Sequence, residues 1–231
     1  MIKYFKKFMK IRLEEKKRAI ELRIQGKTYR EILSLIPNLS KSTLSGWLRN
    51  VKLTNEQEEK LRKNIERITY NAKVKSAWLK REEKLKRIER IFEEAEREYS
   101  LLSKNPLFLI GVILYWAEGS KKSEIFQFSN SDPDAIKAMI KWLTEICKIP
   151  KEEIKIRVYI HKVYAHEKCE EFWSQITGIP LSRFYKTIYK PTPHKLKKNP
   201  NYKGCVQIRV LKTEFFWKVM GWIEKLKKNT N

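Results

Sequence analysis

A stretch without glycine or proline, residues 54–104, constrains this chain more than any other feature. Charged residues dominate it, as in "REEKLKRIERIFEEAEREYSLL". Because glycine and proline are the residues that most often end a helix, their absence predicts one long charged helix. The seam of a coiled coil is predicted over its C-terminal part, where apolar residues alternate in steps of three and four: Leu85, Ile88, Phe92, Ala95, Tyr99 and Leu102. The partner of this seam is either a second copy of the chain or the remainder of the same chain.

The long helix separates two parts of the 231-residue chain that differ in their sequence patterns. "SKNP" at 103–106 breaks the helix and marks a boundary. We therefore expect an N-terminal domain at 1–52, a charged helical linker or coiled coil at 53–104, and a C-terminal domain at 105–231. The fold class expected for the whole is α+β, with an all-α N-terminal part.

The charge of the chain indicates the class of its partner. Lys and Arg number 51 against 27 Asp and Glu, which gives a formal net charge of +24. Such an excess is typical of proteins that bind a polyanion, most simply a nucleic acid. No stretch reaches the roughly 18 consecutive apolar residues of a spanning helix, and "MIKYFKKFMK" has neither the long apolar region nor the small-residue cleavage site expected of a signal peptide. We expect a cytoplasmic, nucleoid-associated protein with no membrane partner.

Residues 14–50 contain the start and stop signals of three short helices. Gly26 ends the first helix, Thr28 can cap the second and Ser40 can cap the third. "GKTYREI" followed by "SKSTLSGWLR" resembles the helix-turn-helix of resolvases and sigma-like regulators. That resemblance implies that the third helix enters the major groove of DNA. The residues expected to contact DNA lie on its polar face: Lys41, Ser42, Thr43, Ser45 and Arg49. The alternative is a plain three-helix packing module with a solvated polar face.

The C-terminal half alternates between helical and strand-like segments. Helices are predicted at 107–118, 132–147, 165–179 and 212–226, and strands at 123–130, 153–161, 181–190 and 204–211. In "EIKIRVYIH" (153–161) isoleucine and valine alternate with Lys155, Arg157, Tyr159 and His161. This alternation predicts a sheet with one face under helices and one cationic face, which suits the phosphate backbone of a duplex. The alternative is a merely basic surface.

Residues 109–230 resemble one LAGLIDADG homing-endonuclease domain. "GVILYWAEG" stands at the place of that family's signature helix, and Glu118-Gly119 falls on its terminal acid-glycine pair. A strand with Gln127, a helix, a cationic strand and "FWSQITGIP" follow in the family's order. The resemblance implies an α/β layer with a mostly antiparallel sheet. Because the chain has one signature, it also implies a homodimer paired through helix 107–118, with Gly111 and Ala117 as small residues that allow close approach.

The same resemblance implies a metal-dependent DNA endonuclease that acts as a homodimer on a near-palindromic duplex site. Glu118 would bind Mg²⁺ or Mn²⁺, Gln127 would orient metal-bound water, and Lys186 would lie near the attacked phosphate. An unpaired acid at a helix C-terminus is electrostatically unfavourable, which also favours a bound cation at Glu118. The alternative for Glu118 is an ion pair with Lys121 or Lys122.

Further DNA contacts are expected from the cationic strands and from the basic loop "PTPHKLKKNPNYK". They are Lys155, Arg157, Tyr159, His161, Arg183, Lys195, Lys197, Lys198, Gln207 and Arg209. Trp116 replaces the more central acid of the family's signature, so a non-cleaving transcriptional regulator on the same scaffold stays open. Because charge alone does not choose the polymer, an RNA-binding protein also stays open.

Overall fold

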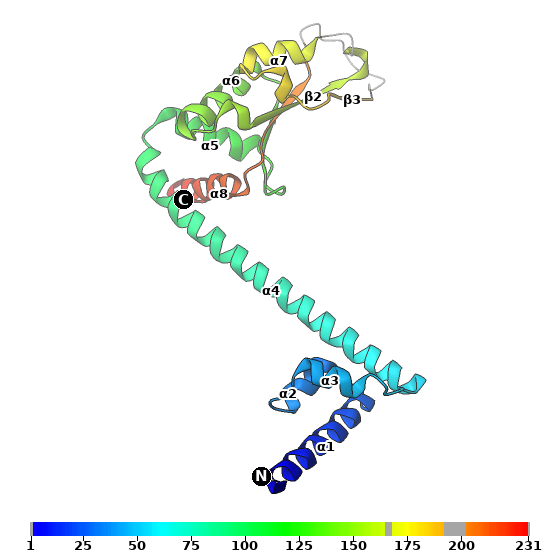
Figure 1. Ribbon diagram of the computed structural model, residues 1–231. Coiled ribbons are helices and arrows are strands. Elements are labelled where there is room, and N and C mark those ends of the chain that lie inside the picture. The colour runs from blue at the N-terminus through cyan, green and yellow to red at the C-terminus, as the bar shows by residue number, and fades with distance from the viewer. Residues whose placement is uncertain (1, 165–167, 192–201, 231) are drawn as a thin grey trace. The chain divides into compact units, whose positions relative to one another are not determined.

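Figure 1 shows the computed structural model of the chain, which describes residues 2–164, 168–191 and 202–230. Helices and one four-stranded sheet confirm the α+β class. The chain divides into two compact units, residues 1–83 and 84–231, and each is described by itself. The division falls within one long helix, because each end of that helix packs against its neighbours in the sequence. It therefore differs from the expected boundaries at 52 and 104.

The first unit is built on three helices, α1 (Ile2–Ile24), α2 (Tyr29–Leu35) and α3 (Lys41–Leu48). Thr28 and Glu31 form a reciprocal capping box at the start of α2, and Ser40 caps α3 through the backbone N–H of Thr43. The predicted caps are therefore in place. The helices enclose a small core of Ala19, Ile32, Ile36, Leu39, Leu44 and Leu48.

The long helix α4 (Asn55–Leu102) begins in the first unit. The side-chain amide of Asn64 donates to the Gly26 carbonyl at 2.9 Å and to the Glu31 carboxylate at 2.7 Å. Gly26 has a φ of +85°, and a Cβ there would lie 3.2 Å from the backbone of Leu61. These contacts hold the start of α4 against the turn between α1 and α2.

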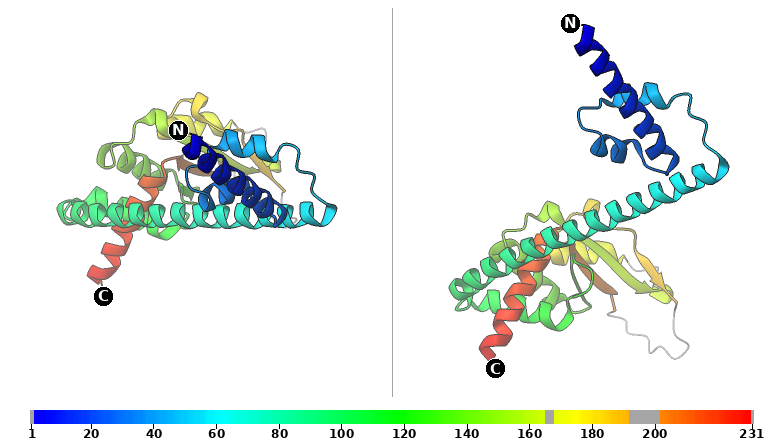
Figure 2. Two further views of the ribbon diagram at one scale, coloured as in Figure 1. Left: turned by 60° about the horizontal axis from the view of Figure 1, so that its bottom comes forward. Right: turned by 90° about the horizontal axis from the view of Figure 1, so that it is seen from below.

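The end of α4 belongs to the second unit, where the last helix, α8 (Thr213–Thr230), lies beside it (Figures 1 and 2). The rings of Phe92 and Trp217 are 6.4 Å apart, and a Cβ at Gly221 would lie 2.7 Å from the Cβ of Ala95. The predicted seam is thus covered within the chain from Phe92 onward. Leu85, at its beginning, is exposed.

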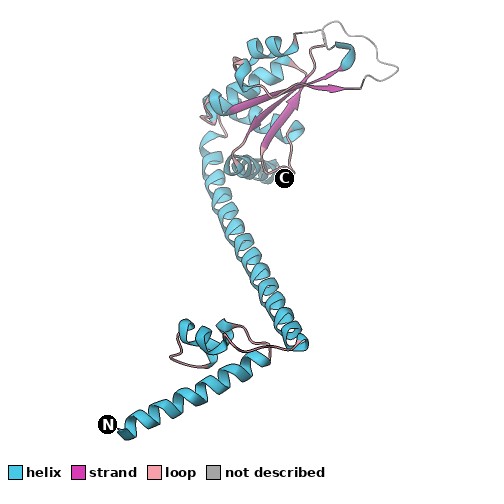
Figure 3. Cartoon of the chain, turned by 45° about the vertical axis from the view of Figure 1, so that its right-hand side comes forward, coloured by secondary structure: helices cyan, strands magenta, loops and turns pink. Residues whose placement is uncertain are grey.

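The second unit contains a four-stranded sheet (Figure 3), in which β1 (Phe126–Asn130), β4 (Cys205–Val210), β2 (Ile154–His161) and β3 (Ile188–Lys190) are neighbours in that order. β4 is antiparallel to β1 and to β2, whereas β2 and β3 are parallel, so the sheet is mixed but mostly antiparallel as expected. The elements are α5 (Pro106–Glu118), β1 (Phe126–Asn130), α6 (Pro133–Lys141), a π-helical turn η1 (Trp142–Ile146), β2 (Ile154–His161), α7 (Cys169–Thr177), β3 (Ile188–Lys190) and β4 (Cys205–Val210). The described part of this unit also contains three 3-10 turns: η2 (Lys151–Glu153), η3 (Lys162–Tyr164) and η4 (Leu181–Arg183).

The predicted strand 181–190 is mostly wrong. Its beginning is the turn η4, and only Ile188–Lys190 forms a regular strand. Phe184 makes an isolated bridge to Ile156, and Ile188 pairs with Tyr159. Four residues on this side therefore span three on β2, and the extra residue breaks the ladder.

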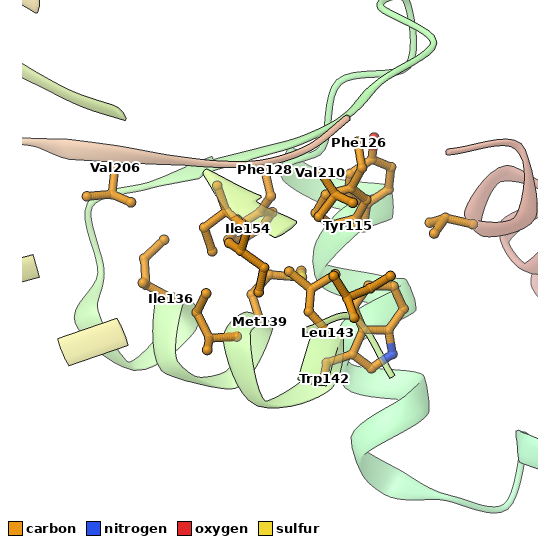
Figure 4. Packing of buried hydrophobic residues seen from close by; sticks show 14 of the residues in the cluster. Tyr115, Phe126, Phe128, Ile136, Met139, Trp142, Leu143, Ile154, Val206 and Val210 are labelled. Atoms are coloured by element: carbon orange, nitrogen blue, oxygen red, sulfur yellow. The ribbon is translucent and has the colours of Figure 1, made fainter. Parts of the chain in front are cut away.

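The core of the second unit lies between the sheet and its helices (Figure 4). Even-numbered strand residues such as Phe126, Phe128 and Ile154 point toward Met139 and Trp142 on the helical layer. Their odd-numbered neighbours point away from it. No described helix is both long and apolar enough to cross a membrane.

Candidate nucleic-acid interface

The face of the sheet that points away from the helices is polar and cationic. We call it the open face and define it by the odd-numbered residues of three strands: Gln127, Ser129, Lys155, Arg157, Tyr159, His161, Cys205, Gln207 and Arg209. All of them are half-buried. The predicted alternation on β2 is confirmed, because its even-numbered residues are buried and its odd-numbered residues are not.

The strand register arranges these side chains in rows. Arg209 is directly opposite Gln127 on one side and Lys155 on the other. In the next row Gln207 is opposite Ser129 and Arg157. Two cations, Lys155 and Arg209, therefore face each other directly across the sheet, an arrangement that destabilises a sheet unless something offsets the repulsion.

Neutral side chains form a chain of long hydrogen bonds along the same face. The Gln207 amide is 3.4 Å from both Gln127 Oε1 and Ser129 Oγ. The Tyr159 hydroxyl donates to Gln207 Oε1, also at 3.4 Å. Gln207 therefore links β2 to β1 and fixes the amide of Gln127 on the open face.

Tyr185 was missed by the sequence reasoning, yet it lies at the centre of the cationic residues. Its backbone N–H donates to the Ile156 carbonyl at 2.8 Å, which sets it beside β2 between Lys155 and Arg157. The Arg157 guanidinium is 4.7 Å from the centre of the Tyr185 ring, that of Arg209 is 5.4 Å away, and the Lys155 ammonium 5.9 Å. One ring thus holds three cations within cation–π range.

Glu118, the proposed metal ligand, is the last residue of α5 and is exposed. Two residues later the Ser120 N–H donates to the Gln127 carbonyl at 2.8 Å, and Gly119 bridges to Phe128. The sequence therefore brings Glu118 and Gln127 to the same corner, as predicted. In the described residues Glu118 has no ion pair with Lys121 or Lys122.

Glu118 makes a small contribution to the pKa of Cys205, a residue of the open face. Burial raises the pKa of the Cys205 thiol, Lys190 opposes this rise, and the negative charge of Glu118 adds to it. Cys205 pairs with Tyr159 on the third row of the face. The Glu118 carboxylate thus contributes to the electrostatics of this face.

Glycine is needed at position 119 because a side chain would not fit there. Its backbone conformation does not require glycine, since a φ of −75° is accessible to any residue. A Cβ at this position would lie 2.5 Å from the ring of Tyr115. Burial raises the pKa of Tyr115 to about 12, and its hydroxyl donates to the Ser120 carbonyl at 2.7 Å. The Tyr115 side chain therefore fixes the bend that carries the chain from Glu118 into the sheet.

The donor set at this corner fits a metal ion only in part. Within the described ranges no group of three or more His, Cys, Asp or Glu side chains could hold a metal ion. One copy of the chain offers a carboxylate from Glu118 and an amide oxygen from Gln127. Mg²⁺ sites of nucleic-acid enzymes commonly use one or two carboxylates and complete the shell with phosphates and water, so a second copy or a bound phosphate is needed.

Lys186 does not lie at this corner within one copy of the chain, and its catalytic role stays a prediction. It is exposed and follows Tyr185 at the β2–β3 edge, whereas Gln127 lies on β1 at the opposite edge of the sheet. The physical reason is the extra residue in this segment, which lifts Lys186 out of the ladder. The cation nearest to Gln127 in the register is Arg209, which faces it directly.

The other residues predicted to contact DNA lie in several different surroundings. Arg183 lies in η4, half-buried, with its Nε atom enclosed and without a hydrogen-bond partner. His161 Nδ1 donates to the Pro191 carbonyl at 2.9 Å. Lys190 lies over the Tyr159 ring at 5.2 Å. Lys195, Lys197 and Lys198 lie outside the described residues.

In the first unit, α3 exposes most of its predicted contact residues. Lys41, Ser42, Ser45 and Arg49 are exposed, and Thr43 is half-buried. The hydroxyls of Ser42 and Thr43 lie 2.9 and 2.8 Å from that of Ser40, so both take part in the cap. Ser45, Lys41 and Arg49 remain as side chains directed at solvent.

No protein-family model, curated protein or solved structure matches the chain. The functional reasoning therefore rests on the geometry of its own residues.

Proposed function

We propose that this chain is a sequence-specific DNA-binding protein that contacts duplex DNA through the open face of the sheet and through α3. The observation that carries this proposal is the open face itself. Its row of cations has no acidic partner among the described residues, and amides and hydroxyls lie between the cations. Phosphates neutralise such cations, while amides and guanidinium groups hydrogen-bond base edges.

The three-helix unit supports a second contact with DNA. Its short helices α2 and α3, the capped start of α3 and the exposed Lys41, Ser45 and Arg49 suit a helix-turn-helix. In such a unit the second helix enters the major groove and its N-terminal residues contact base edges.

A homodimer paired through α5 is part of the proposal. Phe108, Gly111 and Tyr115 of α5 are buried within the unit, whereas Ile110 and Ile113 are 46% and 48% exposed. Ala117, also exposed, continues this stripe at helical spacing. A second copy of the same stripe would cover it symmetrically and place two Glu118 carboxylates near one axis.

Metal-dependent cleavage of the bound duplex is the extension of this function that Glu118 favours. In a LAGLIDADG-like dimer Glu118 would hold Mg²⁺ or Mn²⁺ with the help of Gln127 and DNA phosphates. A bound ion of this kind supplies positive charge and lowers the pKa of a coordinated water. Glu118 itself would hold the ion, and the Gln127 amide would orient the attacking water. The alternative is a regulator that binds the same site and leaves both strands intact.

Selection from a random duplex library tests the DNA-binding function. The purified chain should enrich one near-palindromic sequence, and structured RNA at equal salt should compete poorly for it. Enrichment of no sequence, or displacement of the duplex by equimolar structured RNA, would contradict the proposal.

A further inference from the structure

Three cations are held around one aromatic ring on the open face. Lys155, Arg157 and Arg209 all approach Tyr185, at 5.9, 4.7 and 5.4 Å from the ring centre. Lys155 and Arg209 are cross-strand partners, and Arg157 lies two residues along β2. Without the ring, three like charges on adjacent positions would repel one another and spread into solvent.

The three cations lack the acidic partner that several other basic residues of the second unit have. Elsewhere in the second unit Lys84 pairs with Glu124, Lys218 with Glu98 and Lys225 with Glu96. Within the described residues no carboxylate forms an ion pair with the three cations around Tyr185. The Nε atoms of Arg157 and Arg209 are also enclosed and have no hydrogen-bond partner.

An anion with several acceptor oxygens would neutralise the three positive charges. A phosphodiester carries one negative charge and two free oxygens, which suits the donor fork of a guanidinium group. The Tyr185 ring is itself a poor ligand for a phosphate, because its face is electron-rich. Its contribution is therefore to hold the cations.

We propose that Tyr185 is a positioning residue that gathers Lys155, Arg157 and Arg209 into one phosphate-binding cradle. This inference rests on the proposed function, because the phosphate is taken to come from the backbone of bound DNA. The ring holds the side chains of the cations in place before the phosphate arrives, so that less side-chain entropy is lost on binding.

The first test needs no DNA. In the NMR spectrum of the free protein, the Nε–H signals of Arg157 and Arg209 should be displaced by the ring current of Tyr185. Tyr185→Phe keeps a ring and should keep this displacement, whereas Tyr185→Leu should abolish it. Unchanged arginine signals in a folded Tyr185→Leu variant would overturn the arrangement. Thermal unfolding of each variant verifies that it is folded.

The second test measures duplex binding against salt concentration. Tyr185→Leu should weaken binding about tenfold, the effect of losing favourable cation–π positioning at several cations, and should leave the salt slope unchanged because every charge remains. Arg157→Ala should lower the slope by about one. Affinity within twofold of wild type for Tyr185→Leu would contradict the proposal, as would an equal loss in Tyr185→Phe.

Tyr189→Leu is the matched control. Tyr189 pairs with Ile160 and is therefore on the helical side of the sheet, and no cation lies over its ring in the described chain. This variant should bind as wild type does. In the double variant Tyr185→Leu/Arg157→Ala the losses should be less than additive, because the ring acts through the cation. Full additivity would count against a positioning role.

Titration with inorganic phosphate tests the cradle independently of the proposed DNA-binding function. If the protein binds no duplex, the DNA-binding proposal fails, and phosphate titration decides about the cradle alone. Phosphate should then displace the Arg157 and Arg209 signals of wild type more than those of Tyr185→Leu. Equal, weak displacement in both proteins would overturn the cradle and indicate only non-specific binding.

Discussion

Gly111 and Trp142 are in direct contact in the core of the second unit. A Cβ built on Gly111 would lie 2.1 Å from Cγ of Trp142, well inside any real contact. Gly111 therefore serves packing within one chain, and the expectation that it lets two copies approach is wrong. Because Gly111 faces Trp142, Ile110 and Ile113 point away from the core. The same glycine therefore determines which side of α5 is exposed to solvent.

A methyl group at position 111 should destabilise the second unit. Because Trp142 is fully buried, Gly111→Ala should lower the free energy of unfolding by about 1–3 kcal/mol, the range for overpacked cores. Denaturant unfolding followed by circular dichroism measures the effect. Gly46→Ala provides the comparison, since a Cβ at Gly46 meets nothing within 4 Å, and it should leave the transition of residues 84–231 unchanged. An unaffected Gly111→Ala would show that the indole moves freely.

The outward stripe of α5 should mediate self-association. Ile113→Glu places a charge in the proposed interface and should convert a dimer into monomers of 27.8 kDa without loss of helicity. Sedimentation equilibrium measures the mass of both proteins. Leu101→Glu changes an exposed leucine on α4, outside the proposed interface, and should leave the dimer intact. A wild-type protein that stays monomeric at tens of micromolar would exclude pairing through α5.

The capping box of α2 predicts a pH dependence of the first unit. The backbone N–H of Thr28 is the main cause that lowers the pKa of Glu31 below its ordinary value of 4.5, and Thr28, Asn64 and Lys27 lower it further against burial. Because the folded pKa is lower, the ionised Glu31 stabilises the fold above pH 4.5. This stabilisation is lost as the pH falls through the folded pKa.

Glu31→Gln should therefore remove part of the acid sensitivity. At pH 7 it should lower stability by about 1 kcal/mol, the effect of losing a cap, and at pH 3 the two proteins should differ less. Thermal unfolding across this range measures the difference. Glu58→Gln, on an exposed residue at the start of α4, should show no such trend. A constant difference between Glu31→Gln and wild type at every pH would argue against the assignment.

Glu118→Gln should separate binding from cleavage. The substitution keeps the size of the side chain and removes its charge, so duplex binding should change little in the absence of metal. If the protein cleaves, Mg²⁺- or Mn²⁺-dependent nicking of the selected duplex should fall by at least about a hundredfold. Gel analysis of end-labelled duplex measures it. Normal cutting by Glu118→Gln would remove this residue from the reaction.

Much of the fold could be predicted because its signals are local. The caps at Thr28 and Ser40 and the alternation from Lys155 to His161 depend on neighbours in the sequence. The cationic centre could not be predicted, because it depends on register between segments. Tyr185 and Tyr189 have the same parity, yet they lie on opposite faces because the segment contains one extra residue relative to β2. The same shift places Lys186 away from Glu118 and Gln127 within one copy of the chain.

The helix that packs against the seam on α4 could not be predicted from the sequence either. Phe92 and Ala95 fit a second helix of any origin, and only the fold shows that α8 covers them. For Tyr185, the local signal in the sequence is the composition of its own segment. Tyr185 follows Arg183 and Phe184 in a segment rich in aromatic and basic residues, as expected for a surface that binds nucleic acid.

The most direct test of the account compares two double variants of equal charge. Arg157→Ala/Arg209→Ala removes two cations from the open face, and Lys137→Ala/Lys141→Ala removes two exposed cations from α6, on the opposite side of the sheet. The quantity to measure is the dissociation constant for the selected duplex between about 50 and 200 mM salt. The account predicts that the first variant binds at least about a hundredfold more weakly with a salt slope reduced by about two, while the second binds nearly as wild type does. Equal losses in both variants would show that net charge alone attracts DNA and would contradict a specific interface on the sheet.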